Sequence, residues 1–262
     1  MIGVFDSGVG GLTVVKEIKK AMPDCSIVYF GDTARYPWGN KNAETVQRYS
    51  EEICIFLIAQ GVEDIVIACN TASTFAGDYL RKKFPKINFF NVIDPVVDRI
   101  KLELSAEKNQ KRNIRAGVIG TRGTIESRVY EKKIKKNNPT VGIISQACPL
   151  FVSMVEENMT SHPAAKIIVD EYLKKIKKAK VDFLVLGCTH YPLLEKVIRK
   201  SIGNVAMISS AKEVAKELLR RKNIREDFKE KDIFYFSDVS NHYDKLTRKI
   251  LGKKIKIIKK AL

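Results

Sequence analysis

Two cysteines of this chain are followed by small polar residues that can hold an anion or move a proton. Cys69-Asn70-Thr71 and Cys188-Thr189-His190 each come directly after a short apolar run, where a buried strand would end and a helix would begin. A helix N-terminus lowers the pKa of a thiol, so either cysteine could act as a base near neutral pH. Taken alone, each would be better explained as a buried packing residue, which is our interpretation of Cys25, Cys54 and Cys148.

A faint internal repeat gives the two cysteines equivalent positions. Residues 65–70 (IVIACN) match residues 184–189 (LVLGCT), and residues 3–7 (GVFDS) match residues 117–121 (GVIGT). Two similar lobes could therefore each offer one thiol to the same ligand. Racemisation needs such a pair, because one group must remove the proton of an α-carbon while another returns a proton to the opposite face. The repeat predicts a cofactor-independent amino-acid racemase with Cys69 and Cys188 as its acid/base groups.

The elements that must position these residues follow from hydrophobic periodicity. Short apolar, β-branched runs alternate with longer stretches of helical period, which is typical of parallel sheets covered by helices on both faces. We predict an α/β fold of two similar doubly wound parallel-sheet lobes, related by pseudo-two-fold symmetry, with the active site between them. Strands are predicted at 2–5, 26–30, 64–68, 88–92, 116–119, 141–145, 183–186, 205–208 and 233–236, and the clearest helices at 43–60 and 164–178.

The limits of the two lobes are predicted from breaks in this pattern. A proline interrupts it at Ile93-Asp94-Pro95, and a second break falls at Ser209-Ser210. We therefore expect residues 1–94 and 210–262 to form the first lobe and residues 95–209 the second.

The loop Asp6-Ser7-Gly8-Val9-Gly10-Gly11 has some likeness to the glycine-rich turn of a dinucleotide site. Thr13 replaces the third glycine, however, and Asp6 would place a negative charge where pyrophosphate must lie. Exposed backbone N–H groups beside an aspartate suit a small ligand with an ammonium group. A tight strand-to-helix turn without a ligand explains the glycines equally well.

Composition limits the class of protein. Five widely spaced cysteines without a CxxC pair indicate free thiols and no structural metal. No apolar run approaches the roughly 20 residues of a membrane span, and the N-terminus begins with a strand-like run rather than a secretory signal, so we expect a cytoplasmic protein.

The net charge of +17 is concentrated after residue 95. Residues 245–262 hold eight Lys or Arg and no acid, and we expect a solvated strand and tail there. We expect no nucleic-acid partner, because no aromatic residues interleave with these charges for base stacking.

Five motifs resemble the glutamate racemases of the aspartate/glutamate racemase superfamily, and the resemblance runs along nearly the whole chain. They are GVFDSGVGGL at 3–12, YFGDTARYPWG at 29–39, VIACNTAS at 66–73, GVIGTRGTI at 117–125 and LVLGCTHYPLL at 184–194. The resemblance implies glutamate as a small-molecule substrate, no pyridoxal phosphate or other cofactor, and D-glutamate supplied to peptidoglycan. It also implies that Cys69 serves the D-enantiomer and Cys188 the L-enantiomer; we further expect a homodimer.

The resemblance also implies a binding shell around the substrate. Asp6 and Ser7 would contact the ammonium, and backbone near Trp38-Gly39 would contact the distal carboxylate. His190 and Asp6 would each support a neighbouring thiol. The α-carboxylate would be surrounded by Asn70, Thr71 and Thr189.

The chain departs from the family pattern at a few positions, and some interpretations stay open. Trp38 stands where tyrosine is usual, Ser209-Ser210 replaces Asp-Ser, and Ser153 and Asn158 flank Glu156 in place of proline and glycine, which leaves the role of Glu156 open.

Asp32 and Arg35 are either substrate contacts or a buried pair that holds their loop, and His162 and His242 are surface or capping residues. Racemisation of aspartate or of several amino acids, or a non-enzymatic role with nucleic acid, are the alternative functions.

Overall fold

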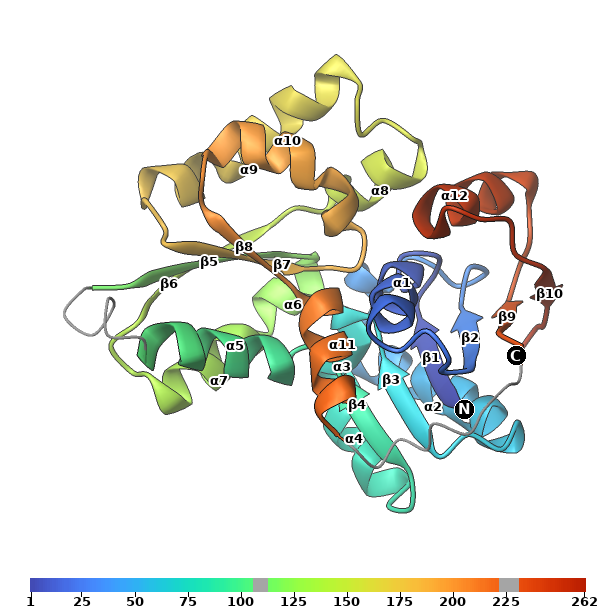
Figure 1. The fold of residues 1–262 in the computed structure, drawn as a ribbon. Helices are drawn as coiled ribbons and strands as arrows, with labels where there is room; N and C mark the ends of the chain where they lie inside the picture. The colour runs from blue at the N-terminus through green and yellow to red at the C-terminus, as the bar shows by residue number, and fades with distance from the viewer. Residues whose placement is uncertain (106–112, 222–230) are drawn as a thin grey trace.

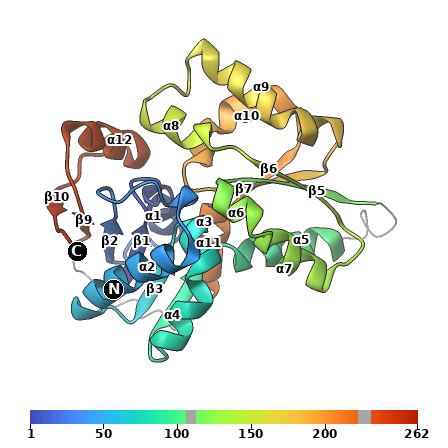
Figure 2. The same ribbon diagram turned by 180° about the vertical axis from the view of Figure 1, so that it is seen from behind.

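The chain folds into two α/β lobes, each built on its own parallel sheet (Figure 1 and Figure 2). This computed structural model describes residues 1–105, 113–221 and 231–262. The larger sheet has the order β10-β9-β2-β1-β3-β4 and the smaller one β6-β5-β7-β8. Neighbouring strands in both sheets pair in parallel. The predicted fold of two doubly wound parallel-sheet lobes is confirmed.

The nine predicted strands are all present, each within two residues of its predicted ends. They are β1 (Ile2–Asp6), β2 (Ile27–Gly31), β3 (Asp64–Ile67), β4 (Asn88–Asn91), β5 (Arg115–Gly120), β6 (Gly142–Ala147), β7 (Phe183–Gly187), β8 (Ala206–Ser209) and β9 (Ile233–Phe236). A further strand, β10 (Ile257–Lys259), pairs with β9 at the edge of the larger sheet.

Helices cover both faces of each sheet, and the alternation of side chains along each strand divides its residues between two cores. On the larger sheet, one face packs under α1 (Leu12–Ala21), α11 (Ser210–Arg220) and α12 (Asn241–Leu251), and the other under α2 (Ala43–Ala59), α3 (Asn70–Phe75) and α4 (Gly77–Lys83). On the smaller sheet, one face packs under α5 (Asp94–Ser105) and α7 (Val129–Asn137), and the other under α8 (Leu150–Glu156), α9 (Pro163–Lys178) and α10 (Glu195–Ile202). Three short helices lie at the strand ends: η1 (Trp38–Asn40), α6 (Arg122–Glu126) and η3 (Tyr191–Leu194).

The internal repeat is visible in the topology of the two lobes. The order β2-β1-β3-β4 in the larger sheet has the same form as β6-β5-β7-β8 in the smaller one. Gly3 in β1 and Gly117 in β5 have equivalent surroundings. A Cβ atom at Gly3 would lie 2.8 Å from Val62 Cγ1, and one at Gly117 would lie 2.9 Å from Leu184 Cδ1. A glycine at this point lets the covering side chains approach the strand closely in both lobes.

Both breaks in the sequence pattern are starts of helices rather than extended linkers. Helix α5 begins at Asp94, and Asn91 Oδ1 accepts hydrogen bonds from the backbone N–H groups of Ile93 (2.9 Å) and Asp94 (2.8 Å). Pro95 fits there because the first turn of a helix has no use for its missing N–H. Helix α11 begins at Ser210 directly after β8 and packs against α1, so it lies where the two lobes meet (Figure 1).

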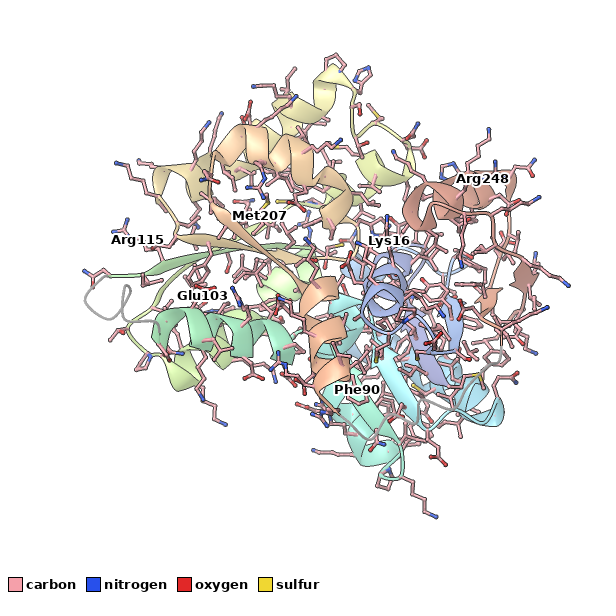
Figure 3. All side chains as sticks on the ribbon, in the orientation of Figure 1. Lys16, Phe90, Glu103, Arg115, Met207 and Arg248 are labelled. Atoms are coloured by element: carbon pink, nitrogen blue, oxygen red, sulfur yellow. The ribbon has the colours of Figure 1, made fainter. Side chains whose placement is uncertain are left out.

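The basic C-terminal segment holds the predicted strand, as β10, and also a helix that was not predicted. Asn241–Leu251 forms helix α12, whose Leu246 and Ile250 are buried in the core beneath α1. Its arginines and lysines face outward, as Arg248 does at the outer surface (Figure 3). The helical spacing of Leu246 and Ile250 was not recognised in the sequence, because lysines and arginines are so frequent in this segment.

The described ranges hold neither a membrane-length apolar helix nor a cluster of metal ligands. None of their helices is long and apolar enough to cross a bilayer. They also contain no group of three or more His, Cys, Asp or Glu side chains placed to hold a metal ion.

Replacing Leu184 by alanine tests the packing of the smaller sheet against α8, α9 and α10. Leu184 is fully buried between β7 and the α8–α9–α10 layer, and truncation should lower the free energy of unfolding by roughly 2–5 kcal/mol. Leu102→Ala is the matched control, since Leu102 is 59% exposed, and should change stability by about 0.5 kcal/mol or less. Urea denaturation followed by circular dichroism measures both, and equal losses would contradict this packing.

Candidate active site

A cavity of about 240 Å³ lies where the strand ends of both lobes meet. Loops that follow β1, β2 and β3 line it from the larger sheet, and loops that follow β5, β6 and β7 line it from the smaller one. Its lining residues are Ser7, Tyr36, Pro37, Trp38, Gly39, Asn40, Cys69, Asn70, Thr71, Thr121, Arg122, Pro149, Leu150, Val152, Ser153, Cys188, Thr189 and His190. Ligands of open parallel sheets bind at these carboxyl ends of strands, so the cavity is the candidate active site.

Cys69 follows β3 and caps helix α3. Its Sγ accepts a hydrogen bond from Ala72 N at 3.5 Å and lies 3.5 Å from Ser7 Oγ. Burial and the charge of Asp6 raise the pKa of the Cys69 thiol to about 12, against the smaller lowering effect of these hydrogen bonds. The lowered pKa expected from the helix N-terminus is therefore wrong for Cys69, because desolvation outweighs the helix.

Cys188 has different surroundings at the equivalent strand end. The short helix η3, of 3-10 type, follows it, and its Sγ lies 3.9 Å from His190 Nδ1. On the far side of the ring, His190 Nε2 lies 2.9 Å from Glu156 Oε1. Burial lowers the pKa of His190, but its hydrogen bonds to Cys188 and Glu156 and their charges outweigh burial and raise it to about 10. The sulfur, imidazole and carboxylate form a chain along which a proton can move.

Asp6 lies behind the lining of the cavity rather than in it. Its carboxylate is fully buried and accepts hydrogen bonds from Gly8 N at 3.1 Å and from Thr189 Oγ1 at 3.4 Å. Burial raises the pKa of Asp6, although the charge of His190 opposes that shift. In this position Asp6 holds the glycine loop and Thr189 in place and acts on Cys69 through its charge.

The glycine loop needs Gly10 and Gly11 for close packing on its neighbours. A Cβ atom at Gly10 would lie 2.4 Å from Thr189 Oγ1 and 2.5 Å from His190 Nδ1, and one at Gly11 would lie 2.4 Å from Asp6 Cβ. No side chain fits at either position. Gly10 therefore brings the first loop against the residues that follow Cys188, and Gly11 lets the loop pack on Asp6 within its own lobe.

Polar side chains at the strand ends join the two lobes around the cavity. Thr13 Oγ1 donates to the backbone oxygen of Thr189 at 2.9 Å. The hydroxyls of Thr71 and Thr121 lie 3.0 Å apart. Ser7, Asn70, Thr71 and Thr189 thus all face the same cavity, as the resemblance implied, while their roles toward a substrate stay predictions.

Trp38 and Gly39 close one side of the cavity. Trp38 is fully buried and packs on Tyr49, with ring centroids 5.6 Å apart. A Cβ atom at Gly39 would lie 2.8 Å from Thr121 Cβ, so this backbone approaches the other lobe closely.

Asp32 and Arg35 lie outside the lining of the cavity. Arg35 Nε donates to Asp32 Oδ2 at 2.7 Å, and Ser237 Oγ donates to Asp32 Oδ1 at 2.8 Å. Of the two interpretations, a buried pair that holds the loop is the one with contacts in the structure.

Several residues of the cavity were not predicted from the sequence. Thr121 is the repeat equivalent of Ser7, and this equivalence could have identified it. Arg122 is the one lysine or arginine among the described lining residues. It is an exposed residue after β5, and nothing in the neighbouring sequence indicates that it lines a cavity. Glu156, whose role was left open, is joined to His190.

The remaining cysteines and histidines have no place in this site. The thiols of all five cysteines are free, with Cys54 and Cys148 buried and Cys25 half-buried. His162 caps helix α9 by accepting a hydrogen bond from Ala164 N at 3.2 Å, as expected of a capping residue, and His242 is exposed.

Known proteins are similar to this chain in both sequence and fold. The family model described as Asp/Glu/Hydantoin racemase matches residues 10–218. The glutamate racemase of Geobacter metallireducens is 44% identical over 260 residues, which cover 97% of this chain and 93% of that protein. The crystal structure of glutamate racemase from Francisella tularensis in complex with D-glutamate has a TM-score of 0.89 at 34% identity, covering 99% of this chain and 97% of that one. A glutamate racemase isoform from Bacillus anthracis has a TM-score of 0.91 at 36% identity, covering 100% and 97%. The chain therefore belongs to the Asp/Glu/Hydantoin racemase family.

Proposed function

We propose that the chain interconverts L- and D-glutamate without a cofactor, with Cys69 and Cys188 as acid/base groups on opposite faces of the α-carbon. The observation that carries the proposal is that two repeat-equivalent thiols, each from a different sheet, line one cavity. The glutamate racemases similar to this chain over nearly their whole length support the choice of substrate.

Racemisation takes two proton transfers, one from the bound substrate and one to it. From L-glutamate, the Cys188 thiolate takes the α-proton, and the Cys69 thiol donates its own proton to the other face. The pKa of about 12 keeps Cys69 protonated at neutral pH, which suits it as the donor in this direction. From D-glutamate the same steps run in reverse, as an equilibrium between enantiomers requires. The His190–Glu156 pair supports Cys188 through the contact of His190 with its sulfur.

The carbanion formed between these steps must be stabilised by the protein. The hydroxyls of Ser7, Thr71 and Thr189 and the amide of Asn70 face the cavity and would bind the ammonium and α-carboxylate. Fixed donors around that carboxylate stabilise the charge that develops on it, more so once lobe closure excludes water. The backbone at Gly39 and the guanidinium of Arg122 suit the distal carboxylate.

Several wider features belong to the same proposal. We place residues 1–94 and 210–262 in one lobe and 95–209 in the other, supported by the pairing of β9 with β2. A cytoplasmic homodimer that supplies D-glutamate for peptidoglycan is consistent with the family.

Activity without cofactor is the first test of this function. Protein dialysed against a chelator, and free of pyridoxal phosphate absorbance, should bring L-glutamate or D-glutamate to an equal mixture in a circular-dichroism time course. Aspartate should react at least tenfold more slowly than glutamate. The reason is that one methylene group changes the discrimination between two substrates by roughly 1–3 kcal/mol. Dependence on added pyridoxal phosphate or metal would contradict the mechanism, and a faster reaction with aspartate would contradict the substrate.

Single cysteine variants test the division of roles. Cys69→Ser and Cys188→Ser should each lose nearly all racemisation, because every turnover needs both groups and a serine hydroxyl is a far weaker base. With substrates that carry a β-leaving group, Cys69→Ser should eliminate from the L-enantiomer and Cys188→Ser from the D-enantiomer. Cys25→Ser, outside the cavity, is the control and should keep normal activity. Elimination from the same enantiomer by both variants would show that the thiols do not lie on opposite faces.

The raised pKa of Cys69 predicts a steep pH dependence for the variant in which it is the remaining base. In Cys188→Ser, elimination from the D-enantiomer should rise about tenfold per pH unit between pH 7 and 10. The reason is that a thiol with a pKa near 12 gains thiolate tenfold per unit over this range. Rates from a stopped assay at constant ionic strength measure this slope, and a plateau below pH 9 would mean that the thiol titrates much lower.

A further inference from the structure

The amide of Asn70 is held at both of its ends by buried hydroxyl groups. Tyr130 Oη donates to Asn70 Oδ1 at 2.6 Å, and Asn70 Nδ2 donates to Ser210 Oγ at 3.3 Å. Asn70 and Tyr130 are each 2% exposed and Ser210 is 1% exposed, so solvent does not compete for these bonds. An amide nitrogen has two N–H donors. The bond to Ser210 uses one and leaves the other for a ligand of the cavity that Asn70 lines.

The bond from Tyr130 decides which end of the amide is the acceptor. A phenol with its proton donates to a carbonyl oxygen, whereas a rotated amide would turn its NH₂ group toward Oη and lose this bond. Burial and the negative charges of Cys188 and Asp94 raise the pKa of Tyr130, so the phenol keeps its proton. Ser210 favours the same orientation more weakly. Its hydroxyl donates to the backbone oxygen of Leu186 at 3.4 Å and accepts from Asn70 Nδ2 at 3.3 Å, and this second bond is longer than the 2.6 Å bond from Tyr130.

Tyr130 reaches Asn70 from the other lobe. It lies on α7, in the core that covers the smaller sheet, whereas Asn70 begins α3 at the end of β3 in the larger sheet. Its ring packs beside the end of β7, the strand that precedes Cys188, since a Cβ atom at Gly187 would lie 3.3 Å from Tyr130 Cε2. Tyr130 itself is not among the residues that line the cavity.

We propose that Tyr130 is a positioning residue, which fixes the Asn70 amide with its N–H group available to the α-carboxylate of the amino-acid substrate. The inference rests on the proposed function, in which Asn70 binds that carboxylate. L- and D-glutamate have the same α-carboxylate. Loss of the fixed amide therefore weakens the binding of both enantiomers to the same extent.

The experiment measures racemisation of both enantiomers by the full chain carrying Tyr130→Phe. KM should rise about tenfold for L- and for D-glutamate, and kcat should fall for both, because the same amide stabilises the charge that develops on the α-carboxylate. Tyr79→Phe removes a hydroxyl that binds the carboxylate of Glu51 on the first lobe, and this matched control should keep the wild-type constants.

The same substitution in an Asn70→Ala background separates positioning from general structural damage. Tyr130→Phe should then change KM by less than twofold, because the amide through which Tyr130 acts is gone. An equal rise in KM in both backgrounds would overturn the inference, as would a wild-type KM in the single variant.

Ser210→Ala provides a test that does not depend on the folding of Tyr130→Phe. Tyr130 still orients the amide in this variant, so KM should stay within threefold of wild type. A tenfold rise would show that Ser210 sets the orientation and would overturn the inference. A wild-type protein inactive on glutamate would instead overturn the proposed function and this inference with it, whereas failure of the variants alone would leave that function standing.

Discussion

The carboxyl ends of β3 and β7 must meet at one cavity, and most of the structure follows from this constraint. A proton that leaves one face of a carbon and returns to the other needs two groups on opposite sides. A parallel sheet presents the carboxyl ends of its strands along one edge, and so reaches a ligand from one side only. Two sheets that face each other can place one group on each side of the ligand. The repeated strand order supplies two such ends with a cysteine on each. Gly10 and Gly39 then let the loops approach across the gap.

Equivalent backbone positions do not give the two thiols equivalent chemistry. Cys69 faces the buried carboxylate of Asp6, whose charge adds to desolvation and keeps the thiol protonated. Cys188 faces His190, which Glu156 holds from the far side. A negative neighbour favours a proton donor, and an imidazole in contact with sulfur offers a route for a proton. The symmetry of the fold thus positions the two thiols at one cavity, while its asymmetry gives them different neighbours.

Hydrogen bonds between the lobes hold the residues around the cavity. Thr13 bonds to the residue after Cys188, and the hydroxyls of Thr71 and Thr121 meet across the cavity. The Tyr130–Asn70 bond crosses between the same lobes. Side chains that line the cavity are therefore held by partners from the opposite lobe, so a change in lobe position would also change the geometry of the cavity.

The sequence by itself determined the strands, the two-lobed α/β class and the pair of cysteines, because hydrophobic period and internal repetition depend only on the order of the residues along the chain. It did not determine the pKa of Cys69, since desolvation depends on residues brought together by folding. Helix α12 was not predicted, because its few apolar residues are spaced among many lysines and arginines in the sequence. The bond between Asn70 and Tyr130 joins positions 60 residues apart. Only the tertiary structure decided these features, because burial and long-range contacts exist only once the two sheets face each other.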